Sequence, residues 1–253
     1  MSNPLYDPLL ILVVSLPTFW ISAWIGASIR KRQRNLKEEG RDDFAFVLGG
    51  SLTLLGLIIG FTFSMAVGRF DQRKNYEEEE ANAIGTEYVR ANLLPAADAA
   101  NVRALLRSYL DQRIILYKTL NEQEIKQINA QTARLQNEMW SAVATPAAAQ
   151  PTPVAALVLA GMNDVLNSQG YTQAAWWNLI PVEAWGLLIA ISIFCNLLIG
   201  YVARGRSHLL FLILPIALSV SLCLIADIDT PRRGFIHVRP QNLESLAESL
   251  HSP

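Results

Sequence analysis

FAFVLGGSLTLLGLIIGFTFSMAVGRFDQRKNYEEEEANAIGTEYVR, residues 44–90, decides the fold of this chain. Its first part, residues 44–68, is apolar and long enough to cross a bilayer, which takes about 20 helical residues. Its second part is charged and follows without a proline or a cluster of turn residues. The stretch therefore predicts one continuous helix that begins as a membrane span and continues beyond the membrane.

Small residues recur at every fourth position of this span, at Gly56, Gly60, Ser64 and Gly68. Residues four apart lie on one face of a helix, and a stripe of small residues lets another helix approach closely in lipid. Two interpretations are open. The stripe packs against a helix of the same chain, or it lines a pore in an oligomer beside Phe61 and Phe63, since hydrophobic constrictions gate by dewetting.

The composition indicates a membrane protein, because 51% of the residues are hydrophobic and only 17% are charged. The apolar residues concentrate in four blocks, residues 8–29, 44–68, 179–203 and 208–226. Each block matches the thickness of a bilayer, so we expect four transmembrane helices in two hairpins with lipid as their partner. No Lys or Arg precedes the first block, which is therefore predicted to be a retained span rather than a cleavable signal peptide.

Several functions are disfavoured by what the sequence lacks. A net charge of −1 argues against a nucleic-acid partner, which calls for a basic face. Cys195 and Cys223 both fall in predicted spans, where a thiol serves as a small apolar packing residue. No Ser/His/Asp set, phosphate-binding glycine loop or histidine metal motif occurs, so neither an enzyme nor a cofactor is predicted.

The segment between the hairpins is predicted to be helical. Asn121 is a candidate N-cap, with Glu124 three residues later. Apolar residues on either side of Asn121 recur at steps of three and four, which is typical of one buried helix face: Val102, Leu105, Leu106, Tyr109, Leu110, Tyr117 and Leu120, then Ile125, Ile128, Thr132, Leu135 and Met139. The predicted fold is all-α, with a first hairpin (1–68), a helical extramembrane segment continuous with the second span (69–178), a second hairpin (179–228) and a tail (229–253).

The distribution of positive charge predicts the orientation. Six Lys and Arg residues follow the first span and none precedes it. Positively charged loops stay in the cytoplasm. Both termini and the 69–178 segment are therefore expected on the opposite side of the membrane, outside the cytoplasm.

Two charged clusters follow spans that run in the same direction, so we expect them to meet as an electrostatic collar. The first holds Arg69, Arg73 and Glu77, and the second holds Asp227, Asp229, Arg232 and Arg233. One interpretation is structural, with Arg69 or Arg73 pairing with Asp227 while the Glu77–Glu80 run forms an exposed helix face. The others are an ion-selective vestibule in a symmetric oligomer, and a weak Ca²⁺ site made by Asp227, Asp229 and Glu80.

Residues 60–95 and 225–238 resemble the bacterial membrane proteins described as having a bestrophin-like domain, a family of unassigned function. Similarity to bestrophins themselves implies a pentameric, Ca²⁺-regulated anion channel whose second span lines the pore. It also implies that the helical segment lies in the cytosol, opposite to the charge count. The Arg-Phe-Pro signature of bestrophins is missing here.

The residues and the resemblance together predict a homo-oligomeric, ion-channel-like protein of a bacterial inner membrane, with inorganic ions as its ligands. The alternative is a non-conducting, membrane-anchored sensor or scaffold whose helical segment binds a partner.

Overall fold

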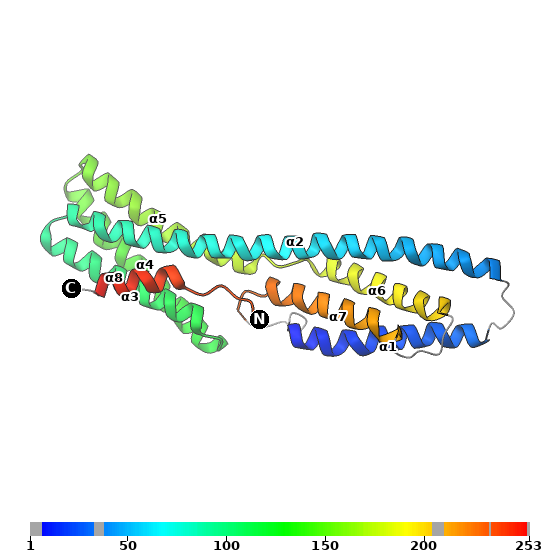
Figure 1. Cartoon of the computed structure of the whole chain (residues 1–253). Coiled ribbons are helices and arrows are strands. Elements are labelled where there is room, and N and C mark those ends of the chain that lie inside the picture. Colours follow the sequence, from blue (N-terminus) through cyan, green and yellow to red (C-terminus); the bar gives the residue numbers. More distant parts are fainter. Residues whose placement is uncertain (1–6, 33–37, 204–209, 233, 252–253) are drawn as a thin grey trace. The chain divides into compact units, whose positions relative to one another are not determined.

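The computed structural model describes residues 7–32, 38–203, 210–232 and 234–251. Within these ranges all regular structure is helical and no strand occurs. Figure 1 shows the helices, which in chain order are α1 (Pro8–Arg32), α2 (Glu38–Arg90), the short 3₁₀ helix η2 (Ala91–Leu93), α3 (Ala96–Lys118), α4 (Glu122–Ala149), α5 (Pro153–Trp177), α6 (Val182–Val202), α7 (Leu210–Asp229) and α8 (Gln241–His251).

Four helical stretches are long and apolar enough to cross a membrane: Pro8–Arg32, Asp43–Leu93, Pro153–Val202 and Phe211–Asp229. The predicted number of spans is confirmed, and the chain is a multi-pass membrane protein. The pairing of the spans into hairpins stays a prediction.

The second span continues without a break into the charged sequence, as predicted, because α2 runs for 53 residues from Glu38 to Arg90. In the middle segment α5 covers 25 residues, from Pro153 to Trp177.

The chain forms two compact units. The first comprises Met1–Phe70 and Leu179–His237, and the second comprises Asp71–Asn178 and Val238–Pro253. Helix α2 contributes its first part to one unit and its last part to the other. The four segment boundaries expected from the sequence stay predictions.

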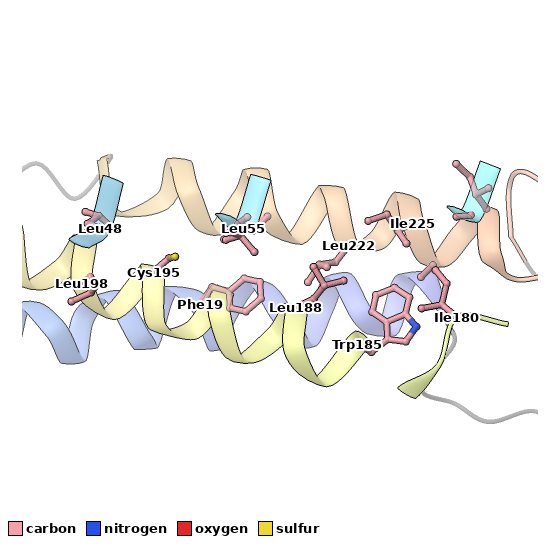
Figure 2. Close-up of a cluster of buried hydrophobic side chains, with 14 residues drawn as sticks. Phe19, Leu48, Leu55, Ile180, Trp185, Leu188, Cys195, Leu198, Leu222 and Ile225 are labelled. Carbon is pink, nitrogen blue, oxygen red and sulfur yellow. The ribbon is translucent and has the colours of Figure 1, made fainter. Parts of the chain in front are cut away.

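The core of the first unit is a cluster of apolar side chains from α1, α2, α6 and α7. Figure 2 shows Phe19, Leu55, Leu188 and Leu222 turned toward one another, and each is at most 1% exposed. Cys195 lies in the same cluster, as expected for an apolar packing residue. Helix α1 packs against both α6 and α7.

Helices α1 and α6 approach each other closely at a point where two glycines face each other's backbone. A methyl group at Gly26 would overlap the carbonyl oxygen of Leu197, and one at Gly200 would overlap that of Ala23. Backbones come this close only where both helices present glycine, and in lipid such contact is a main source of helix association.

The second unit is a helical bundle whose faces follow the predicted spacing. Its contacts pair α3 with α4, α4 with α5, and α3 with α8. The carboxamide oxygen of Asn121 accepts a hydrogen bond from the backbone N–H of Gln123 (2.9 Å), which confirms the predicted cap. The predicted apolar faces are buried at their central positions: Val102, Leu106, Tyr109, Leu110 and Tyr117 on α3, and Ile128, Thr132, Leu135 and Met139 on α4.

The glycine crossing yields a matched test. We expect Gly200→Ala to lower the melting temperature of the detergent-solubilised protein, since overpacking costs about 1–3 kcal/mol. Gly186→Ala adds the same methyl group to the same helix, at a position where no described atom lies within 4 Å of it, so it serves as the control. Equal melting temperatures for the two variants would contradict the tight α1–α6 contact.

Candidate functional site

In the first unit α2 has one face that contributes to the core and one that the chain leaves uncovered. The core face carries Leu48, Leu55 and Ala66, which belong to the buried cluster, and Figure 2 shows the first two pointing into it. Only 11% of the apolar window of α2 is buried, against 44% for α7. Most of this span is therefore available to lipid or to another chain.

The predicted small-residue stripe lies on the uncovered face. A methyl group at Gly56, Gly60 or Gly68 would have no described atom within 4 Å, and Ser64 is exposed. At about 100° per residue, Gly60, Ser64 and Gly68 lie on the side of the helix opposite Leu55 and Ala66, and Gly56 lies about a quarter-turn away from both. Packing against a helix of the same chain, one of the two interpretations of the stripe, is therefore not what the described residues show.

The two phenylalanines of the predicted site flank the stripe. Phe61 is 64% exposed and Phe63 is 38% exposed, so neither is part of the core. They are two positions apart, hence about 200° around the helix, and lie on opposite sides of the glycines. The uncovered face therefore has a smooth centre between two aromatic edges.

At the end of α7, Asp229 joins three parts of the first unit. Its side chain is fully buried, and it accepts a hydrogen bond from Arg69 Nη1 (3.3 Å) and one from the backbone N–H of Ile180 (2.8 Å). These two hydrogen bonds tie the end of α7 to the middle of α2, where its part in the first unit ends, and to the start of the segment that leads into α6. The sequence suggested Asp227 as the arginine's partner, whereas the structure gives Asp229.

Asp227 instead organises the segment after α7. Its carboxylate accepts hydrogen bonds from the backbone N–H groups of Phe235 (2.7 Å) and Ile236 (2.9 Å). Gly234 lies so close to Asp227 that any larger residue would overlap it. Arg232 is half-buried, and Arg233 lies outside the described residues. The role of Asp227 is thus to hold a turn, which an apolar pattern cannot reveal.

The predicted charged residues of the second unit are buried. Arg73 is 1% exposed and donates from Nε to the carbonyl oxygen of Ala175 (3.2 Å) and from Nη2 to that of Asn178 (3.3 Å). Glu77 accepts three hydrogen bonds at the start of α8, from both nitrogens of Asn242 and from the N–H of Leu243. Burial raises the pKa of Glu77 above its ordinary value, although these hydrogen bonds act in the opposite direction.

Glu80 forms a buried ion pair with Arg113 of α3. Both side chains are fully buried, Arg113 Nε donates to Oε1, and Nη2 donates to Oε2 (3.2 Å). The hydroxyl of Thr172 adds a third donor to Oε2 (3.0 Å). Burial has the largest single effect and lowers the pKa of Arg113, but the charge and hydrogen bonds of Glu80, together with Tyr109 and Tyr117, raise it overall. The expectation of an exposed glutamate face was wrong for Glu77 and Glu80, and only the intervening pair is exposed.

The sequence contained a signal for this network that an apolar pattern misses. Arg73, Glu77, Glu80, Ile84, Glu87 and Ala91 are all buried, and they follow one another at steps of four and three. Arg113 likewise lies four residues from Tyr109 and four from Tyr117 on the buried face of α3. The sequence does show a helical repeat on the buried face, but most of the residues that form this repeat on α2 are charged.

Members of the predicted collar have partners within each unit, and the collar as a whole stays a prediction. Arg69 and Asp229 meet in the first unit, while Arg73, Glu77 and Glu80 each have partners in the second. The described residues hold no group of three His, Cys, Asp or Glu that could bind a metal ion. The weak Ca²⁺ candidate of Asp227, Asp229 and Glu80 stays a prediction.

An all-helical chain with four membrane-crossing stretches, one of them extended by a long charged helix, defines a class of multi-pass membrane protein. The model of the Bestrophin-like domain family matches residues 13–243. The chain belongs to this family, as the resemblance of its sequence predicts.

Solved structures with the same fold support the assignment. A bacterial bestrophin homologue from Klebsiella pneumoniae with a single mutation is 16% identical, with a TM-score of 0.65 over 96% of this chain and 97% of that one. Another structure of a Klebsiella pneumoniae bestrophin homologue is 17% identical, with a TM-score of 0.64 over 96% of each chain. A structure described as a membrane protein variant is 15% identical, with a TM-score of 0.66 over 94% and 97%. No curated protein matches the chain.

The Arg69–Asp229 pair is open to a double-mutant cycle. Arg69→Met removes a charged hydrogen bond to a buried carboxylate, which costs about 1.5–3 kcal/mol. We expect the cost of Arg69→Met to be smaller when Asp229 is already Asn, measured as the change in melting temperature in detergent. Strictly additive effects would contradict a direct pair.

Breaking the Glu80–Arg113 pair is expected to lower the free energy of unfolding more than breaking the Arg69–Asp229 pair does. Arg113→Met leaves a buried carboxylate without its cation, which costs about 3–5 kcal/mol. The exposed pair of Lys118 and Glu244 supplies the control, because breaking it with Lys118→Met costs at most about 1 kcal/mol. Thermal unfolding of the full chain should separate the two variants clearly, and similar values would show that Glu80 is not held by Arg113.

Proposed function

We propose that copies of this chain assemble into a homo-oligomeric ion channel of a bacterial inner membrane, with the uncovered face of α2 lining the ion path. The observation that carries this proposal is the small-residue stripe itself. Gly56, Gly60 and Gly68 have open space around them in the single chain.

A lipid-facing surface gives no reason for such a stripe. Leu, Ile, Phe and Val gain the most from hydrocarbon, whereas glycine gains little and weakens a helix. Small residues are useful where something must approach the backbone closely or where a narrow space must stay open. An uncovered glycine face therefore favours a function that requires several copies of the chain to assemble.

A closed ring of identical chains places the same face of each copy around one axis. A single chain with one uncovered span encloses no path, so the proposed function requires the oligomer. Phe61 and Phe63 then form apolar edges at the same depth as the glycines, where a hydrophobic constriction gates by dewetting. Membership of a bestrophin-like family and the resemblance to bestrophins favour anions as the permeating ions.

Flux from protein reconstituted into liposomes tests the proposal. We expect the native protein to dissipate a chloride gradient faster than a potassium gradient, and Gly60→Leu to reduce the chloride flux strongly by filling the centre of the stripe. Gly186→Leu is the matched control, since Gly186 of α6 is also a membrane glycine with no described atom near its Cβ position.

Two results would overturn the proposal. One is a folded, oligomeric protein that carries no flux in any ion gradient, which would favour the membrane-anchored scaffold. The other is full chloride flux through the Gly60→Leu variant. Cross-linking in native membranes, run alongside, reports whether the oligomer exists. The side of the membrane on which the second unit lies stays the prediction made from loop charge.

A further inference from the structure

Glu87 is the exception among the buried carboxylates of α2. It is fully buried, like Glu80, and Glu77 is nearly so. Those two glutamates each accept three hydrogen bonds, but neither oxygen of Glu87 has a hydrogen-bond donor among the described residues. A buried carboxylate without donors is costly when charged and much less costly when protonated.

The carboxyl group of Glu87 lies against the backbone of α5. A methyl group at Gly161 would overlap both Oε2 of Glu87 and Nη1 of Arg90. A glycine at this position is what permits the two side chains to lie between the helices. The ionisable group is therefore part of the contact between α2 and α5 inside the second unit.

Two charged groups act on Glu87, one from each helix. Arg90 of α2 favours the ionised form and Asp164 of α5 opposes it, but burial has the largest effect and raises the pKa of Glu87 to about 8. At neutral pH the carboxyl group is therefore mostly protonated, and it becomes charged over a mildly alkaline range.

We propose that Glu87, held without hydrogen-bond donors against Gly161, is a proton-operated latch that keeps the α2–α5 contact closed when protonated and releases it when ionised. The latch does not depend on ion conduction, so a negative result for the channel would not contradict it.

The sign of the effect follows from the two states. In the open or unfolded chain Glu87 titrates near its ordinary value of 4.5, and in the closed contact it titrates near 8. The closed state therefore holds more protons between these values, and its stability falls as the pH rises through that window. The loss levels off above pH 8, where both states are ionised.

Hydrogen–deuterium exchange of the full-length protein in detergent tests the latch. From pH 6.5 to pH 8.5 the ionised fraction rises from about 3% to about three quarters. After correction for the intrinsic pH dependence of exchange, we expect residues 153–166 of α5 to exchange many-fold faster at pH 8.5, while residues 182–202 of α6 do not change.

Glu87→Gln keeps the shape of the protonated group and cannot ionise, so the alkaline increase should disappear in this variant. Glu79→Gln, an exposed neighbour on the same helix, should behave as the native protein does. An unchanged increase in Glu87→Gln, or no increase in the native protein, would overturn the proposal.

A second variant, Asp164→Asn, tests the same assignment if Glu87→Gln folds poorly. Asp164 is exposed and its charge raises the pKa of Glu87. Asp164→Asn should therefore move the midpoint of the exchange transition to lower pH. A midpoint that stays in place or rises would contradict the assignment of the transition to Glu87.

Discussion

In a bilayer, helices gain nothing from leaving the lipid, so the first unit depends on close contact between backbones. The α1–α6 crossing supplies that contact, because Gly26 and Gly200 each leave room for the partner's carbonyl oxygen. Around it the side chains of four helices form one apolar cluster. Helix α2 uses one face for this cluster and leaves its glycine face outside it, so this span is packed on one side only.

The second unit is organised by a different constraint, the burial of charge. Four ionisable residues of α2, Arg73, Glu77, Glu80 and Glu87, face its interior. Donors and acceptors for three of them come from positions far along the chain, on α3, α5 and α8. Each such bond fixes the place of a helix more precisely than apolar contact does, since an unpaired buried charge is strongly penalised. Glu87 alone lacks donors, which makes its contact sensitive to protons.

The sequence predicted what depends on length and local periodicity, and missed what depends on partners. Apolar block length located the spans, and spacing located the faces of α3 and α4 and the Asn121 cap. The stripe at Gly60 was recognised, but a helical pattern does not say what contacts it. Gly26 and Gly200, which do meet a neighbour, are isolated glycines in their spans. The run from Glu77 to Glu80 was expected to be exposed because a search for apolar residues does not detect a buried helix face formed by charged ones.

The charged groups at the end of the first unit bear on how the proposed channel would discriminate between ions. Arg69 and Asp229 neutralise each other, and Asp227 is engaged by two backbone N–H groups. Paired charges create a weaker field at a pore mouth than a ring of free charges of one sign would. In the proposed channel, discrimination would therefore fall on the uncovered face of α2, where Gly60 and Ser64 expose the helix surface between Phe61 and Phe63. Control of conduction by dewetting, rather than by a charged vestibule, is the mechanism this arrangement favours.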